Sequence, residues 1–339
     1  MKNNISRQYK FDNIKAILIF LVVFAHIIEK SKDLQAVYMF IYSFHMPLFM
    51  FVTGYFAGFN RKNIIFRFGY TYFLFQTLYI LFDIFILQKT TDFQYTKPKW
   101  ILWYLFAMIV YFIIFPMFDA ERIKAYPKRR IAVILLLFLL ALFAGFENTL
   151  DYDFSASRIV YFLPFFISGY YFKNDEPLKK LFMASSFRKS IISIVLFLGM
   201  SVGTVLWLKY GVDNDILTSR MLYGSYSYEA IGYSLPVRFV IMLVANVWIY
   251  VFLLFTPDKY IPLVSDVGRY TLPVFLLHGF IVSYLWKIAS EGVIEIGLLS
   301  ALAITMIIVL LLGNKTINKL FVNCFTGKFL EKIVDKYLK

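Results

Sequence analysis

The chain has 339 residues, of which 60% are hydrophobic and only 17% are charged. A water-soluble domain of this length cannot hide so many apolar side chains in one core, so the composition excludes a soluble globular protein. The net charge is +14, and the single cysteine, Cys324, excludes both an intramolecular disulfide and a thiolate metal cluster.

Ten apolar segments follow one another along the chain, and about 20 apolar residues are enough to span a bilayer. The predicted spans are residues 12–29, 35–58, 64–88, 100–118, 130–147, 157–172, 190–209, 235–256, 267–288 and 293–313. The first is not followed by a small-residue cleavage site, so we expect it to stay attached rather than act as a signal peptide. The sequence therefore predicts an all-α integral membrane protein, a polytopic bundle of about ten transmembrane helices.

The basic residues gather on one side of this predicted membrane. Counting loops alternately from a cytoplasmic N-terminus places 25 of the 35 Lys and Arg residues on the inner side and ten on the outer side. The loops 122–130 and 173–189 carry much of this excess, as the positive-inside rule requires. We therefore attribute the basicity to topology rather than to nucleic-acid binding, and we expect both the N-terminus and the C-terminus to be cytoplasmic.

Two segments outside the spans have patterns of their own. The outer segment 209–234 is rich in tyrosine, which indicates either a cover over a glycan, because aromatic rings stack on sugars, or an interfacial aromatic belt. In residues 315–339, apolar residues recur at helical spacing beside lysines, which predicts a basic amphipathic helix on the inner membrane surface. We therefore divide the chain into a transmembrane domain, 1–314, and a tail, 315–339.

A short motif recurs in two of the spans. Residues 47–55 and 164–170 both begin with proline and end in Gly-Tyr. Small residues at helix contacts account for such a pattern. A duplicated transporter fold is the alternative explanation.

Polar side chains inside spans are costly, so the few that occur mark candidate functional positions. They are His26, His45, Asp83 and His278, with Lys15 near the inner end of the first span and Arg238 near the outer end of the eighth. His26 follows Lys15 by eleven residues, which is about 16 Å along a helix. An imidazole at that depth can act as a general base, whereas the structural alternative is an interhelical hydrogen bond.

Two groups of charged residues lie near the inner ends of the first and third spans. The first group either anchors its helix through ion pairs or binds an anionic cytosolic ligand. The second group either clamps phosphates, since Arg offers a bidentate fork, or only sets topology. The residues are Arg7, Asp12 and Lys15 in the first group and Arg61, Lys62 and Arg67 in the second.

Four segments in chain order resemble the acyltransferase 3 family of membrane O-acyltransferases. The first, RQYKFDNIKAILIFLVVFAH (7–26), resembles the family's first-helix signature, in which Lys or Arg precedes His by ten intervening residues. The others are FHMPLFMFVTGYFAG (44–58), LWYLFAM (102–108) and GRYTLPVFLLH (268–278). The resemblance spans about residues 7–315 and is strongest to stand-alone members related to fucose 4-O-acetylases. The family's paired arginines and Pro-Tyr at helix three are replaced here by Arg61, Lys62 and Arg67, followed by Tyr-Thr-Tyr.

The resemblance implies an O-acetyltransferase of the bacterial plasma membrane. It would move an acetyl group from cytoplasmic acetyl-CoA, without a permanently bound cofactor or metal, to a hydroxyl of a cell-surface polysaccharide or an undecaprenyl-linked glycan. The esterase-like outer domain of larger members has no counterpart in this sequence, so the membrane domain is expected to acylate the acceptor itself or to pass the acyl group to a partner. A homodimer is left open. The alternative function is a secondary transporter or flippase for a sugar-lipid.

The resemblance also assigns expected roles to individual residues. His26 is expected to act as base or transient acyl carrier, supported by Lys15 and Asp12. The expected substrate-binding residues are Arg7, His45, Trp103, Tyr104, His278, Arg61, Lys62 and Arg67. Among these, His278 is expected to polarise the acceptor, and His45, Trp103 and Tyr104 to line the cavity.

Overall fold

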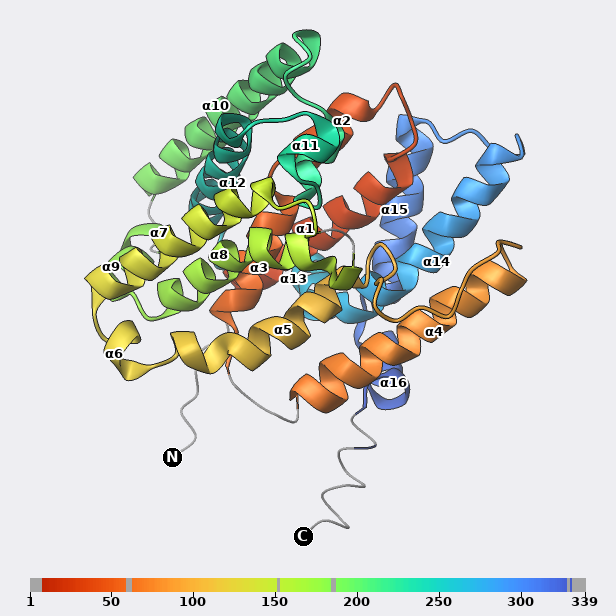
Figure 1. Cartoon of the computed structure of the whole chain (residues 1–339), viewed down its shortest axis with the longest axis horizontal. Helices are drawn as coiled ribbons and strands as arrows, with labels where there is room; N and C mark the ends of the chain where they lie inside the picture. Colours follow the sequence, from red (N-terminus) through yellow and green to blue (C-terminus); the bar gives the residue numbers. More distant parts are fainter. Residues whose placement is uncertain (1–7, 59–62, 151–152, 184–186, 328–329, 331–339) are drawn as a thin grey trace.

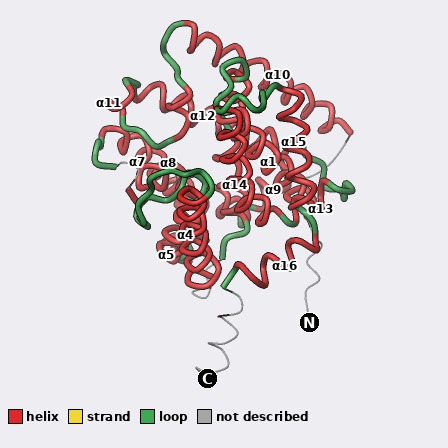
Figure 2. Tube along the Cα trace, turned by 90° about the vertical axis from the view of Figure 1, so that its right-hand side faces the viewer, coloured by secondary structure: helices red, strands yellow, loops and turns green. Residues whose placement is uncertain are grey.

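A computed structural model describes residues 8–58, 63–150, 153–183, 187–327 and 330. These residues form helices and loops, with no strand among them (Figure 2). The long elements are α1 (Tyr9–Ile28), α2 (Gln35–Tyr42), α3 (His45–Tyr55), α4 (Tyr70–Phe85), α5 (Trp103–Phe118), α7 (Pro127–Phe143), α8 (Ala156–Lys173), α9 (Glu176–Met183), α10 (Phe187–Asp213), α12 (Leu235–Phe255), α14 (Thr271–Ser290), α15 (Leu298–Leu312) and α16 (Lys315–Phe325). The short ones are η1 (Asn63–Gly69), α6 (Glu121–Lys124), η2 (Ala144–Phe146), η3 (Asp153–Ser155), η4 (Ser219–Tyr223), α11 (Tyr228–Ile231) and α13 (Val264–Arg269).

Within the described ranges, seven helices are long and apolar enough to cross a membrane, or eight if α15 and α16, bent by 68° at their junction, form one span. The protein is thus a multi-pass membrane bundle. A helix lies in each of the ten predicted spans, but α5 has only 16 residues. In α8, Arg158 and Lys173 interrupt the apolar sequence, and the helix is buried along most of its length, so it needs no lipid-facing surface. The count of ten and the cytoplasmic termini stay predictions.

Helix α1 lies in the middle of the bundle (Figure 1), packed against α13, α14, α15 and α3. Its first turns are fixed by hydrogen bonds to the last turn of α12 and to the segment that follows it. The buried Lys10 ammonium donates to the Leu253 carbonyl at 2.6 Å, and the Asn13 side chain donates to the carbonyls of Pro257 and Lys259 at 3.0 Å each. Because these polar groups are satisfied inside the protein, the inner end of α1 is held at a defined depth.

Helices α3 and α8 cross through the two copies of the repeated motif. A Cβ atom on Gly54 would lie 1.8 Å from the Phe166 carbonyl oxygen, and one on Gly169 would lie 1.9 Å from that of Phe51. Only glycine permits so close an approach of two backbones. The repeat is therefore explained by a helix crossing, as the small-residue interpretation predicted.

The loop between α4 and α5 folds back along α4 instead of staying at the membrane surface (Figure 1). The buried side-chain amide of Gln76, in the middle of α4, donates to the carbonyls of Gln94 and Lys97 at 2.8 and 3.0 Å, and its oxygen accepts from the backbone N–H of Lys99 at 2.9 Å. Asp83, the predicted charge inside a span, forms an ion pair with Lys99. The returning loop thus carries Trp100 and the start of α5 into the bundle.

Helix α16 begins at the predicted boundary of the tail and lies across one end of the bundle (Figure 2). Its Phe321 is buried, with its ring 5.7 Å from that of Phe75 in α4. Because Asn318 of α16 and Lys15 of α1 line the same cavity, the beginning of α1 and the tail helix lie at the same end of the molecule. We call this end, which is the expected cytoplasmic one, the inner side, and the opposite end the outer side.

Candidate active site

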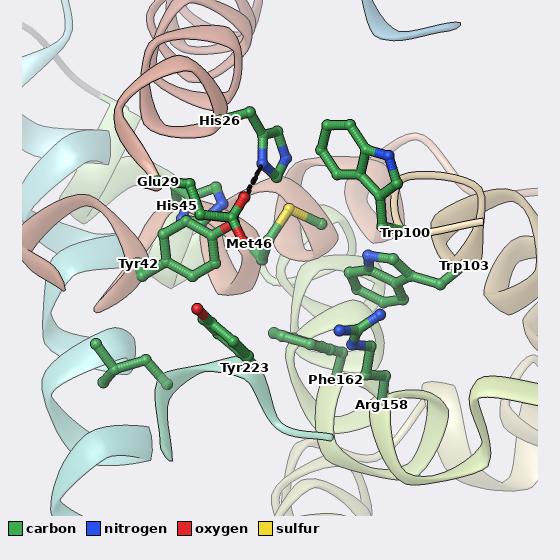
Figure 3. A pocket seen from close by; sticks show the side chains of 11 residues that line it. His26, Glu29, Tyr42, His45, Met46, Trp100, Trp103, Arg158, Phe162 and Tyr223 are labelled. Carbon is green, nitrogen blue, oxygen red and sulfur yellow. Dashed lines mark hydrogen bonds and ion pairs between the residues drawn. The ribbon is translucent and has the colours of Figure 1, made fainter. Parts of the chain in front are cut away.

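Two cavities lie along α1, one at each end. The outer pocket, of about 90 Å³, is lined by His26, Glu29, Tyr42, His45, Met46, Trp100, Trp103, Arg158, Phe162, Leu222 and Tyr223 (Figure 3). The inner cavity, of about 600 Å³, is lined by Lys15, Phe49, Val52, Thr53, Phe56, Ala57, Phe66, Arg67, Phe68, Tyr104, Leu105, Phe112, Arg269, Thr271, Leu272, Phe275, Asn318, Val322 and Thr326. Its volume is typical of a site for a small molecule or cofactor.

His26 is the central polar group of the outer pocket. Its Nδ1 lies 3.4 Å from Oε2 of Glu29 and 3.4 Å from the Tyr42 hydroxyl, and its ring meets the edge of Trp100 at 4.4 Å between centroids (Figure 3). A carboxylate only accepts hydrogen bonds, so an ionised Glu29 holds the proton on Nδ1. The Nε2 lone pair of His26 is then available as a base or a nucleophile.

His45 and His278 have the same tautomer as each other, because each donates through Nδ1 to the carbonyl four residues earlier. His45 bonds Ile41 at 2.9 Å, and His278 bonds Val274 at 2.9 Å. A carbonyl cannot donate, so in the neutral form Nε2 of each ring carries a lone pair. Nε2 of His278 is buried and has no partner among the described residues. In this form His278 can accept a proton from a hydroxyl but cannot polarise an acceptor by donating to it.

The structure brings the three histidines into one group. The rings of His26 and His278 stack at 5.6 Å, and the Tyr42 ring lies 6.2 Å from His26 and 4.6 Å from His45. In the described part of the chain, no three His, Cys, Asp or Glu side chains converge in a way that could hold a metal ion. Imidazole groups gathered in this way can transfer protons or act as nucleophiles.

The far side of the outer pocket is formed by α8 and the outer segment 209–234. The Arg158 guanidinium lies 5.4 Å from the Trp103 ring, and its Nε donates to the Ser225 hydroxyl at 2.6 Å. Burial raises the pKa of the Tyr223 hydroxyl, so it stays protonated. Three tyrosines of this segment (Tyr223, Tyr228 and Tyr233) face inward rather than forming an interfacial belt.

The inner cavity is lined by basic and aromatic side chains. Lys15, Arg67 and Arg269 come from α1, η1 and α13, and all three line it. The Lys15 ammonium lies 2.9 Å from Oδ1 of the buried Asp12. A Cβ atom on Gly268 would lie 1.7 Å from the Asp12 carbonyl oxygen, so glycine at this position lets α13 contact α1 and places Arg269 at the cavity. Three cations from separate elements form a site suited to an anionic ligand.

The linings of the two cavities meet on α5. Tyr104 lines the inner cavity, where its hydroxyl lies 2.7 Å from the Thr53 hydroxyl and its ring lies 5.4 and 5.3 Å from the rings of Phe49 and Phe275. Trp103, the preceding residue, lines the outer pocket. Adjacent residues of one helix therefore line the two cavities.

The predicted site residues fall into three sets. His26, His45 and Trp103 line the outer pocket with His278 beside them, whereas Lys15, Arg67 and Tyr104 line the inner cavity and Asp12 pairs with Lys15. Arg7, Arg61 and Lys62 lie outside the described residues. Sequence reasoning missed Glu29, Tyr42, Trp100, Arg158 and Arg269, whereas Tyr223 belongs to the tyrosine-rich segment that it considered as a cover over a glycan.

Some of the missed residues carried a signal in the sequence. Glu29 follows His26 by three residues, which is one helical turn, and Arg269 lies within the quoted late-helix segment. Trp100 carried none, because only the returning loop brings it to His26.

Comparison with known proteins gives one match. A family model described as an acyltransferase domain matches residues 8–313. No curated protein and no solved structure matches the chain. The matched range begins just before α1 and ends between α15 and α16, so it contains every residue that lines the outer pocket.

Proposed function

The chain belongs to the acyltransferase 3 family, and from this premise we propose that it is an O-acetyltransferase. The donor would be cytoplasmic acetyl-CoA, and the acceptor a hydroxyl of a cell-surface or lipid-linked polysaccharide. The observation that carries the proposal is the pair of cavities on α1, a basic one at the inner side and a histidine-containing one at the outer side.

The inner cavity supports the choice of donor. CoA carries phosphates at one end and a thioester at the end of a long, thin arm. Lys15, Arg67 and Arg269 provide the cationic side chains that phosphates require, and Arg offers two parallel donors. The cavity has the volume of a cofactor site. Its aromatic wall toward Tyr104 suits the uncharged arm rather than the phosphates.

The spacing along α1 supports the route of the acyl group. Lys15 and His26 are about 16 Å apart at 1.5 Å per residue of helix. If the phosphates of CoA bind at Lys15, its long arm therefore has to cover this distance to bring the thioester to His26. Tyr104 lines the inner cavity, and the preceding residue, Trp103, lines the outer pocket. Passage beside the Tyr104 ring would bring the thioester carbonyl to the outer pocket.

His26 would perform the chemistry with its Nε2 lone pair. As a general base, Nε2 takes the proton of the acceptor hydroxyl while the hydroxyl oxygen attacks the thioester carbonyl carbon. The carbon–sulfur bond then breaks, and the imidazolium returns the proton to the CoA thiolate. As a nucleophile, Nε2 itself attacks the thioester carbonyl carbon, the carbon–sulfur bond breaks and CoA leaves as a thiolate. The acceptor hydroxyl then attacks the acetyl carbon, the carbon–nitrogen bond breaks, and the hydroxyl proton neutralises the thiolate. Glu29 serves both routes, because it holds the proton on Nδ1 and stabilises the positive charge that develops.

The test is to separate donor binding from chemistry in detergent-purified protein and in membrane vesicles. We expect acetyl-CoA to raise the unfolding temperature of both the wild type and His26→Ala, because His26 does not line the inner cavity. Transfer of labelled acetyl groups into membrane glycan should occur only in vesicles with the wild type. A transporter would gain no stability from acetyl-CoA. Equal transfer by the two proteins would contradict the proposed role of His26.

A further inference from the structure

Arg158 is a half-buried cation that neither the topology nor the chemistry at His26 explains. It lies in the first turn of α8 and lines the outer pocket. Its guanidinium is held from two directions, by the Ser225 hydroxyl at Nε and by the Trp103 ring at 5.4 Å. Both contacts fix its position before any ligand arrives.

The positive-inside rule does not explain a basic residue at this position. Arg158 belongs to the outer side, which holds ten of the 35 basic residues. Its neighbours in the pocket include Phe162 and Leu222, and placing a guanidinium beside apolar groups costs desolvation energy. A charge kept at such a cost within a pocket is more often functional than structural.

The charges of the pocket are separated. Glu29 lies beside His26 on one side, and Arg158 lies with Trp103 on the other (Figure 3). At about 90 Å³ the pocket has room for the acyl group and the reacting hydroxyl, not for a whole sugar chain. The part of the acceptor next to the reacting hydroxyl can therefore lie against the Arg158 side.

We propose that Arg158 recognises an oxyanion on the acceptor, so that the natural acceptor is an acidic glycan. The recognised group is a carboxylate or a phosphate close to the hydroxyl that is acylated, because both match the planar fork of a guanidinium. The proposal rests on the acyltransferase function proposed above and adds to it the chemical class of the acceptor.

A purely structural role is the competing explanation, since Arg158 also connects α8 to the outer segment through Ser225. The two roles differ in their kinetics. A structural role lowers transfer to every acceptor alike, whereas recognition of an anion affects only acceptors that carry one.

The experiment measures acetyl transfer from acetyl-CoA by purified full-length protein to surface glycan extracted from cells that lack the protein. The glycan is used untreated, after chemical reduction of its carboxylates, and after removal of its phosphates with hydrofluoric acid. For the wild type, we expect one of the two treatments to lower kcat/KM by about 10- to 100-fold, the range of a charge-assisted hydrogen bond. Which treatment has this effect identifies the anion.

Arg158→Gln should lower kcat/KM for the untreated glycan by a similar factor and should cause no further loss with the neutralised glycan. Arg158→Lys, which keeps the charge, should restore part of the activity. Arg220→Gln is the matched control, because Arg220 is an exposed arginine of the outer segment 209–234 and does not line the pocket. Binding of acetyl-CoA, followed by thermal stabilisation, should be unchanged in all three variants.

Two results would overturn the proposal. One is that the wild type acetylates the untreated glycan and both neutralised forms equally well. The other is that Arg158→Gln lowers transfer to all three forms by the same factor, which would make Arg158 structural. Absence of transfer from the wild type to any form, with acetyl-CoA still bound, would instead contradict the acetyltransferase function itself.

Discussion

Replacing Glu29 by Gln tests how far the carboxylate beside His26 contributes to catalysis. Its Oε2 lies 3.4 Å from Nδ1 of His26, at the long end of hydrogen-bond distances, and the Glu29 side chain is 31% exposed. Water therefore screens part of the interaction. In metal sites, removing a carboxylate that orients a histidine lowers metal affinity or activity about 10- to 100-fold. Because the contact of Glu29 is long and partly solvated, we expect the loss in Glu29→Gln to lie near the lower limit of this range. We expect kcat to fall about tenfold.

The assay is the initial rate of acetyl transfer to extracted surface glycan at varied acetyl-CoA concentration. KM for acetyl-CoA should not change, because Glu29 lies beyond His26 and does not line the inner cavity. Glu291→Gln, an exposed carboxylate at the end of α14, is the control. An unchanged kcat would show that Glu29 does not orient His26. Inactivity as complete as that of His26→Ala would equally refute the reasoning, because a supporting residue leaves residual activity.

Two further predictions concern donor binding and the helix crossing. Arg269→Gln should raise the Kd for acetyl-CoA about tenfold, measured by calorimetry in detergent, because it removes a cation from the inner cavity. The control is Arg122→Gln, which lies outside the cavity and should leave the Kd unchanged. The same Kd for both variants would show that Arg269 does not bind the donor. Gly54→Ala should destabilise the bundle by about 1–3 kcal/mol, because its Cβ would overlap the Phe166 carbonyl. Gly199→Ala, with open space around its Cβ, should not lower the unfolding temperature; equal effects of the two alanines would contradict the close crossing.

The membrane bundle and its histidine group could be predicted because both rest on local properties of the chain. Apolar length predicts spans, and a polar residue inside an apolar helix is visible without any knowledge of its neighbours. His26, His45 and His278 were found in this way, and they do meet. The resemblance assigned Lys15 to the support of His26, and Tyr104 to one cavity with His45 and Trp103. Both Lys15 and Tyr104 line the inner cavity instead, which is separate from the pocket of His26.

The parts that could not be predicted depend on long-range folding. Trp100 reaches His26 only because the loop after α4 returns into the bundle, where Gln76 and Asp83 hold it. Nothing in the local sequence distinguishes this loop from one that stays at the surface. The division into two cavities likewise depends on how α3, α5 and α14 pack around Tyr104.

Arg158 and Glu29 could be predicted only in part, since the sequence shows both as charged residues at the outer ends of helices. Charged residues at the ends of spans are common, so their position alone does not mark them as functional. The structure distinguishes them by placing both in the pocket of His26.

The central claim, that His26 transfers an acetyl group to a surface glycan, is tested most directly by the O-acetyl content of that glycan in living cells. Cells that lack the protein are complemented with the wild type or with His26→Ala, matched for protein in the membrane fraction, and the purified glycan is analysed by mass spectrometry. We predict O-acetyl groups with the wild type and none with His26→Ala. Equal O-acetyl content in the two strains would contradict the account.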